Sequence, residues 1–214
     1  TMFLEPNTRA RVGDLLRGII VQSGNDACIV VAENLAGSEE AFARRMTERA
    51  RAMGMSGTQF MNATGWPNPD HYTTAHDLAL LAERTIKDFP EYFHYYSEKE
   101  FTYNDIRQSN RNPLLYGYPG ADGMKTGHTE EAGYGLTATA ERDGRRLILV
   151  VNGLSSAKER SSEGAKLLDW AFREFDNYKM FSSGDTVEIA PVWLGTKPTV
   201  EMKIGRDVFL TMSR

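Results

Sequence analysis

The sequence predicts an α+β fold, with a domain of helices and antiparallel strands over residues 1–178 and the beginning of a small β-rich domain over residues 179–214. Three observations support this class. Helical periodicity dominates residues 1–90, two-residue alternation around a tight turn dominates residues 134–154, and short strand-like runs follow residue 184. With 214 residues, of which 41% are hydrophobic, the chain is long and apolar enough to form a globular core.

The first two helices are expected on either side of a break at residues 23–26. Residues 14–22 are rich in apolar side chains, and Asp14 stands where it can cap their helix. Residues 27–36 are apolar on nearly every side, which is typical of a central, buried helix. The break therefore joins a short helix to a buried one.

Two further helices are predicted in this part of the chain. Ser38 and the acidic residues after it form a favourable helix start, and apolar side chains follow at helical spacing. Residues 56–72 contain several glycines and prolines and are expected to form a loop. Thr74 with Asp77 resembles a capping box, which opens a helix over residues 75–87.

The character of the sequence then changes from helix to strand. A small hairpin is predicted over residues 100–108. The strongest hairpin signal lies at residues 134–154, where Asp143 and Gly144 supply the tight turn. Residues 155–175 form an amphipathic pattern, which predicts a long helix packed on that sheet.

The carboxy-terminal part reads as short strands. Residues 177–184 are expected to be a boundary, and strands are predicted at residues 186–190, 191–195 and 208–212. These strands are too few to close a sandwich by themselves. We therefore interpret them as the start of a second, all-β domain.

Composition and charge exclude several classes of function. The net charge is −4, and the basic residues form no cluster, so a nucleic-acid partner is not expected. Cys28 is the single cysteine, which excludes an intramolecular disulfide and a multi-cysteine metal site. No apolar run approaches the roughly 18 residues that a transmembrane helix needs.

Two short motifs are candidates for chemistry. Ser23-Gly24-Asn25 places a hydroxyl and a carboxamide together at the break between the first two helices. Lys125-Thr-Gly precedes the strong hairpin and is expected on a strand. Taken singly, the first motif is more simply a helix cap and the second a lysine at the end of a strand.

Together the motifs have a specific meaning. A Ser-x-Asn followed by Lys-Thr-Gly corresponds to two of the three motifs of the penicillin-recognising serine enzymes, whose third motif is Ser-x-x-Lys. The sequence resembles the low-molecular-mass penicillin-binding proteins of the D-alanyl-D-alanine carboxypeptidase type over essentially its whole length. The segments that resemble this family are Ser23–Cys28, Asn110–Asn112, Asp122–Thr129, Ala132–Tyr134, Pro191–Gly195 and Val208–Met212.

The resemblance implies a β-lactamase/transpeptidase-like domain and a serine D,D-carboxypeptidase of the bacterial cell envelope. Such an enzyme removes the terminal D-Ala from peptidoglycan stem peptides through an acyl-enzyme, is trapped by β-lactam antibiotics, and needs no cofactor or metal. Family members commonly carry a carboxy-terminal amphipathic anchor, so peripheral membrane association is part of the expectation. The alternatives are a D,D-endopeptidase or β-lactamase of the same fold, or a non-catalytic binding fragment.

The resemblance also assigns catalytic roles. Ser23 relays a proton toward the leaving nitrogen, and Lys125 beside it keeps a positive charge that favours the anionic character of the hydroxyl. Asn25 orients the peptide group of the substrate, because its amide offers both a donor and an acceptor.

Four further residues are expected to bind the substrate. Thr126 and Gly127 lie on an edge strand to which an extended peptide can pair, and the glycine leaves room for its approach. The backbone N–H of His128 is the family's donor to the oxyanion. Arg111 is a candidate partner of the terminal carboxylate, since a guanidinium pairs with it bidentately.

One departure from the family pattern affects the nucleophile. No Ser-x-x-Lys stands before Ser23, and the one match in the chain, Ser155 to Lys158, follows the Lys-Thr-Gly motif and opens a predicted helix, where serine is a natural cap. We therefore expect that the chain lacks the amino-terminal part of its catalytic domain, including the nucleophile. The chain alone is then not expected to react covalently with penicillin.

A zinc-dependent peptidase is the remaining alternative. His71, His76 and Asp77 lie close together in the sequence and include metal-binding side-chain types. Five-residue spacing puts the two histidines on different helix faces, and Asp77 already has a capping role. Cys28 is expected to be a small buried hydrophobe near the site rather than a nucleophile.

Overall fold

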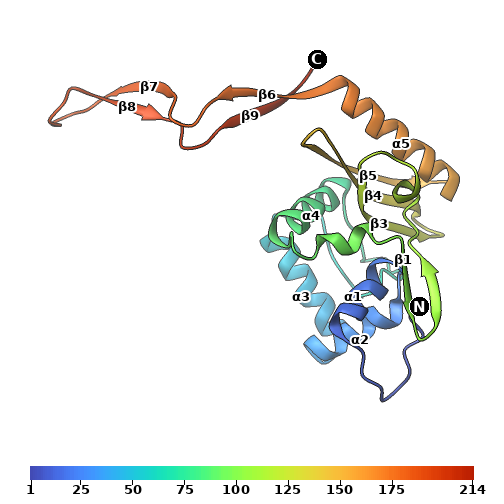
Figure 1. The fold of residues 1–214 in the computed structure, drawn as a ribbon. Helices are drawn as coiled ribbons and strands as arrows, with labels where there is room; N and C mark the ends of the chain where they lie inside the picture. The colour runs from blue at the N-terminus through green and yellow to red at the C-terminus, as the bar shows by residue number, and fades with distance from the viewer. The chain divides into compact units, whose positions relative to one another are not determined.

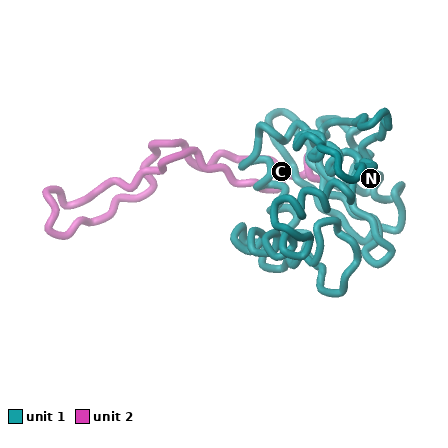
Figure 2. Tube along the Cα trace, turned by 90° about the horizontal axis from the view of Figure 1, so that it is seen from below, with its two compact units in different colours: residues 1–168 teal, residues 169–214 magenta.

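The computed structural model describes residues 1–214 and divides into two compact units, Thr1–Leu168 and Asp169–Arg214 (Figure 2). The boundary between the units falls earlier in the chain than residue 178, where the sequence analysis places the end of the first domain.

Four helices form the amino-terminal part of the first unit (Figure 1). They are α1 (Val12–Ile20), α2 (Asn25–Ala36), α3 (Glu39–Ala52) and α4 (Ala75–Asp88). All four predicted helices are therefore confirmed, with ends shifted by one or two residues. No helix in the structure has the combination of length and apolar character needed to cross a bilayer.

The helix caps are local and explain these boundaries. Ser38 Oγ accepts a hydrogen bond from the Ala41 amide at 3.1 Å, as predicted for the start of α3. The prediction for α1 is wrong in detail, because Arg11 is the N-cap residue and Asp14 lies within the first turn. There the carboxylate still interacts favourably with the positive end of the helix dipole.

The start of α4 is tied to the loop before it. Thr74 Oγ1 accepts from the Asp77 amide at 3.1 Å, which confirms the first half of the capping box. The Asp77 carboxylate turns to the loop, where it accepts hydrogen bonds from Thr58 Oγ1 at 2.6 Å and from the Gly57 amide at 2.9 Å. The bond from Thr58 is the main reason that the pKa of Asp77 is lowered.

Short elements link the helices to the sheet. The predicted hairpin is present as β1 (Glu100–Tyr103) and β2 (Ile106–Ser109), which pair antiparallel. The 3₁₀ helix η1 (Phe93–Ser97) precedes it, and η2 (Pro113–Tyr116) follows it. Helix α1 contacts this connection at η1 and β1.

A three-stranded antiparallel sheet completes the first unit. Its strands are β3 (Ala121–Thr129), β4 (Gly133–Arg142) and β5 (Arg145–Leu154), in the order β3-β4-β5. The strong hairpin prediction is confirmed, with Asp143 and Gly144 in the turn at φ 51° and 75°. Strand β3 lies at one edge of the sheet, where it pairs only with β4.

Helices lie against this sheet. Helix α4 contacts β5 and β4. The long predicted helix is present as α5 (Ala157–Glu174) and packs closely at Gly164, where an added Cβ would be 3.2 Å from Leu136 Cδ2 and 3.7 Å from Leu149 Cδ2. The glycine therefore permits the close approach of α5 to β4 and β5.

The second unit contains two pairs of strands. They are β6 (Phe175–Phe181) with β9 (Val208–Ser213), and β7 (Thr186–Pro191) with β8 (Thr199–Lys203). The predicted strands at 186–190 and 208–212 are confirmed, but two other predictions are wrong. Most of the expected boundary at 177–184 is strand β6, and of the residues 191–195 only Pro191 belongs to a strand, as the end of β7, before a turn.

Both predictions fail because the side chains of these segments are exposed to solvent. Strand β6 has polar residues among its apolar ones because most of its side chains are exposed, so it lacks the alternation of a half-buried strand. The apolar residues Trp193 and Leu194 lie in the turn, 91% and 86% exposed, and Leu194 has φ 57°. An apolar run need not be a strand when nothing packs on it.

Candidate functional site

Ser23 lies in the sharp turn between α1 and α2. Its φ is 51°, in the left-handed region, which costs a residue other than glycine about 1–3 kcal/mol. The Gly24 amide closes the turn by donating to Gly18 O at 2.9 Å. A Cβ on Gly24 would be 3.2 Å from that oxygen, so the close turn favours glycine at this position.

The amino-terminal segment packs behind this turn. Met2 is fully buried, and a Cβ on Gly18 would be only 1.8 Å from Met2 Sδ. Asp26 accepts hydrogen bonds from the Met2 amide at 2.9 Å and the Leu4 amide at 3.1 Å. Partial burial opposes ionisation of Asp26, but hydrogen bonds from Met2, Thr1 and Leu4 outweigh it and lower its pKa to about 2.

Lys125 reaches Ser23 from the sheet. It lies in the middle of β3, and its Nζ donates to Ser23 Oγ at 2.6 Å and to Thr126 O at 2.9 Å. The structure thus brings together the two residues that the sequence motifs single out, 102 positions apart in the chain. Because the ammonium occupies an acceptor site on Ser23 Oγ, the hydroxyl proton remains available to a third group.

Burial is the main reason that the pKa of Lys125 is lowered, from 10.5 to about 8. Repulsion by the guanidinium groups of Arg111 and Arg160 lowers it further, whereas Cys28 acts in the opposite direction. The lysine is therefore mostly protonated at neutral pH. The half-buried thiol of Cys28 has a raised pKa, also because of burial, so it is held in the neutral form.

Arg160 is a candidate site residue that the sequence analysis missed. It lies on α5, only 8% exposed, and its Nη1 donates to Gly127 O at 3.4 Å. Its guanidinium lies over the Tyr134 ring, 5.5 Å from the centroid, and its Nε is buried without a hydrogen-bond partner. Burial lowers the pKa of Arg160.

A sequence signal for Arg160 was present. With Gly164 and Leu168 it occupies positions i, i+4 and i+8 of the long helix, and therefore shares a face with residues that are expected to pack on the sheet. A charged side chain on such a face is rarely buried unless it is paired. This pattern identifies Arg160 as a candidate binding residue.

Arg111 completes a group of three cations with Lys125 and Arg160. It is exposed and immediately precedes the fully buried Asn112, and its charge lowers the pKa values of the other two. The structure gives no member of the group a carboxylate partner. Three neighbouring positive charges, two of them poorly solvated, form a favourable site for an anion.

A cavity of about 440 Å³ adjoins Lys125, whereas Ser23, Arg111 and Arg160 are not among its lining residues. Strand β3 contributes Lys125, Thr126 and Gly127 to its lining, and the apolar part of the lining comes from α1, α4 and the sheet. A Cβ on Gly127 would have no atom within 4 Å, so the backbone of β3 is open to approach at this point. A second cavity of about 390 Å³ lies between residues 4–15 and α2, and contains none of the predicted site residues.

The other predicted site residues have separate positions. Asn25 is exposed at the first position of α2, two residues from Ser23. The side chain of His128 is exposed at the end of β3, where its ring packs on that of Tyr134 with centroids 3.9 Å apart.

The Ser155 to Lys158 match lies at the start of α5, two residues before Arg160. Ser156 Oγ accepts from the Glu159 amide at 3.0 Å, and Ser155 donates to the Glu159 carboxylate. Both serines therefore stabilise the start of α5, although the capping side chain is Ser156 and not Ser155. Lys158 is exposed.

The histidines considered for zinc occupy different environments. His71 packs edge-on against Phe60, with centroids 5.6 Å apart, and burial lowers its pKa. His76 is exposed in the first turn of α4, with its Nδ1 3.3 Å from Asp77 Oδ1. No group of three or more His, Cys, Asp or Glu side chains is arranged to hold a metal ion.

The comparisons with known proteins agree with this geometry. The family model for D-alanyl-D-alanine carboxypeptidase matches residues 1–156. The chain is 42% identical to D-alanyl-D-alanine carboxypeptidase DacA of Escherichia coli K12 over 214 residues, which cover 100% of this chain and 53% of that protein.

Solved structures show the same relationship. Penicillin-binding protein 5 from Haemophilus influenzae is 40% identical with a TM-score of 0.93, and the match covers 100% of this chain and 63% of that one. Penicillin-binding protein D2 from Listeria monocytogenes, solved in an ampicillin-bound form, is 34% identical with a TM-score of 0.69, over 74% of this chain and 66% of that one.

The chain spans about half the length of the curated relative. The family model nevertheless matches most of this chain, and it includes Ser23, Arg111 and Lys125. The fold is the transpeptidase-like fold of the low-molecular-mass penicillin-binding proteins. This chain belongs to the D-alanyl-D-alanine carboxypeptidase family.

Proposed function

We propose that this chain provides the substrate cleft and the proton-transferring residues of a serine D,D-carboxypeptidase, which removes the terminal D-Ala from peptidoglycan stem peptides. The observation that supports the proposal most directly is the 2.6 Å hydrogen bond from Lys125 Nζ to Ser23 Oγ beside the open edge of β3. A bacterial cell-envelope location and inhibition by β-lactams belong to the same proposal, and the ampicillin-bound relative supports the latter.

The substrate binds as an extra strand. An extended peptide pairs with the backbone of β3 at Thr126 and Gly127, where the absence of a side chain on the glycine permits its approach. The terminal carboxylate then lies among Arg111, Arg160 and Lys125. It provides these three cations with an anionic partner. Asn25, exposed at the start of α2, orients the peptide group of the substrate.

The chemical step forms an ester between a serine oxygen and the penultimate D-Ala carbonyl, while the C–N bond to the last D-Ala breaks. The base of the Ser-x-x-Lys motif takes the proton of the nucleophilic serine and passes it to Ser23. Ser23 gives its own proton to the departing nitrogen, because Lys125 already donates to the Ser23 oxygen and leaves that proton free. The charge of Lys125 stabilises the serine oxygen as the proton leaves. The His128 amide donates to the oxyanion, and water finally hydrolyses the ester.

The nucleophile of this reaction belongs to a Ser-x-x-Lys motif, which does not occur before Ser23 in this sequence. The chain alone therefore binds the ligand without forming the acyl-enzyme. Incubation with a fluorescent penicillin followed by denaturing electrophoresis tests this point. We expect no labelled band, and a covalent adduct on this chain would show that its nucleophile has been misplaced.

Binding is tested by titrating the chain with N-acetyl-D-Ala-D-Ala and with the amide of the same dipeptide. The free carboxylate is expected to bind more tightly, and substitution of Arg111 by glutamine should remove most of this preference. Arg107→Gln is the matched control, because Arg107 is an exposed arginine on β2, four residues before Arg111, and its partner is Glu100. Equal affinity for the acid and the amide would contradict the proposal.

A further inference from the structure

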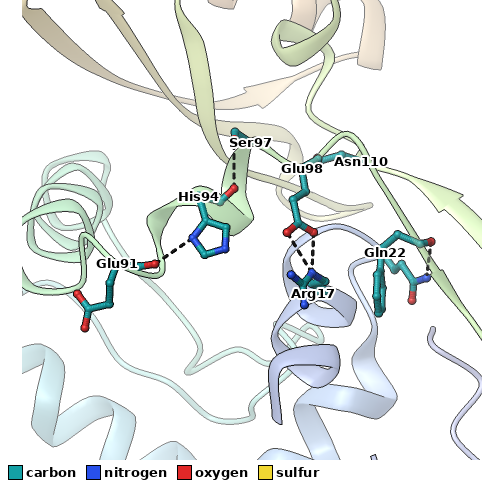
Figure 3. A network of polar contacts seen from close by, with 8 residues as sticks. Arg17, Gln22, Glu91, His94, Ser97, Glu98 and Asn110 are labelled. Atoms are coloured by element: carbon teal, nitrogen blue, oxygen red, sulfur yellow. Dashed lines mark hydrogen bonds and ion pairs between the residues drawn. The ribbon is translucent and has the colours of Figure 1, made fainter. Parts of the chain in front are cut away.

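Two buried amide side chains attach the site to one short segment of backbone (Figure 3). Gln22, directly before Ser23, donates from Nε2 to Phe101 O at 3.2 Å. Asn110, directly before Arg111, donates from Nδ2 to Glu98 O at 3.0 Å. The proton-relay residue and the carboxylate-binding residue are thus each preceded by an amide that is anchored within residues 98–101.

Further hydrogen bonds hold Asn110 in place. The residue is 5% exposed, and its backbone N–H donates to Lys99 O at 2.7 Å. Its side-chain Oδ1 accepts from the backbone N–H of Asn112 at 2.9 Å. Tyr116 Oη donates to Lys99 O at 2.8 Å and also lies 2.9 Å from Asn110 O. These bonds fix the backbone on both sides of Arg111, although Arg111 itself is exposed.

The same segment is attached to helix α1. Arg17 Nε donates to both carboxylate oxygens of Glu98, at 3.0 and 2.9 Å (Figure 3). The guanidinium of Arg17 also lies 4.6 Å from the centroid of the Tyr95 ring. Helix α1 leads directly to Gln22 and Ser23, so the ion pair connects the helix that carries Ser23 to the segment that supports Arg111.

We propose that residues 98–101, together with Gln22 and Asn110, form a positioning support that sets the separation between Ser23 and Arg111. This inference rests on the proposed function, in which Arg111 binds the substrate carboxylate and Ser23 serves the scissile bond of the same dipeptide. None of the support residues touches the substrate. They act by keeping Arg111 and Ser23 at a fixed distance. When Arg111 binds the substrate carboxylate, the scissile bond of the same dipeptide then lies at Ser23.

The role of the support is tested by removing the Asn110 side chain. Replacement by alanine leaves Glu98 O without its side-chain donor and frees the backbone before Arg111. We expect the preference for N-acetyl-D-Ala-D-Ala over its amide to fall about tenfold in Asn110→Ala. The affinity for the amide, which lacks the charge that Arg111 recognises, should change by less than about twofold. A general loss of folded structure would weaken the binding of both ligands by the same factor.

The experiment is an NMR-detected titration of both ligands with the wild-type chain, Asn110→Ala and Tyr116→Phe. The tyrosine variant removes one hydroxyl from a half-exposed side chain, so it tests the support if Asn110→Ala fails to fold, and it should lower the preference severalfold. Arg107→Gln on β2 is the control and should keep the wild-type preference. An unchanged preference in both Asn110→Ala and Tyr116→Phe overturns this inference alone, whereas a wild-type chain without any preference overturns the proposed function as well.

Discussion

Replacing Lys125 by methionine should show by how much the buried ammonium beside Ser23 lowers the free energy of unfolding. Burial lowers the pKa of Lys125 from 10.5 to about 8. The folded chain therefore holds this proton less tightly than the unfolded chain does. The difference of about 2.5 in pKa corresponds to about 3 kcal/mol of free energy.

The sign follows from the direction of this change. Because the pKa of Lys125 is lower in the folded state, its protonation destabilises the fold. The penalty is fully present below about pH 8 and disappears as the pH rises toward 10.5, the value of the unfolded state. Between pH 7 and pH 10 the free energy of unfolding of the wild-type chain should rise by about 2–3 kcal/mol relative to Lys125→Met.

Urea unfolding monitored by circular dichroism at pH 7, 8, 9 and 10 measures this difference. Other titrating groups are common to both proteins, so they cancel in the comparison. Lys166→Met, at a lysine with 70% of its side chain exposed, controls for the loss of a surface lysine. If the difference between wild type and Lys125→Met stays constant over this range, the Lys125 ammonium is not desolvated beside Ser23, and our account of the site is wrong.

Three further substitutions test the fold and the cleft. Ser38→Ala removes the cap of α3 and should lower the free energy of unfolding by about 1 kcal/mol in urea denaturation; no change would show that the bond to Ala41 contributes nothing. Leu136→Ala, at a side chain 1% exposed beneath Gly164, should lower it by about 2–5 kcal/mol, and a loss below about 1 kcal/mol would contradict the packing of α5 on β4. Gly127→Val places a side chain in open space, so stability should change by less than about 0.5 kcal/mol while binding of N-acetyl-D-Ala-D-Ala falls at least about tenfold. Undiminished binding to this variant would exclude pairing along β3.

The helices were predictable because their signals are local. Ser38 and Thr74 cap helices through bonds that span three residues, and the apolar stripe of each helix follows its own periodicity. The central hairpin was equally clear from Asp143 and Gly144. Strands β6 and β8 were not predicted, because β6 mixes polar with apolar residues and β8 is a short, fully exposed strand with charged residues among its apolar ones.

The site was predictable only in part. The motifs around Ser23 and Lys125 pointed to the contact through resemblance to a family, and no local rule places two residues together across 102 positions. Arg160 lies near Gly127 because Gly164 lets α5 approach the sheet, which is a consequence of tertiary packing. The support formed by residues 98–101 likewise depends on side chains from two distant segments, and no single stretch of sequence reveals it.

The central claim is that an extended dipeptide pairs with β3 and directs its carboxylate to Arg111 and Arg160. A crystal structure of the chain with N-acetyl-D-Ala-D-Ala tests this claim most directly. Our account predicts a peptide antiparallel or parallel to β3 at Gly127, with its carboxylate between the two guanidinium groups and its last nitrogen beside Ser23 Oγ. A dipeptide bound in the cavity between residues 4–15 and α2, or one whose carboxylate meets neither arginine, would contradict it.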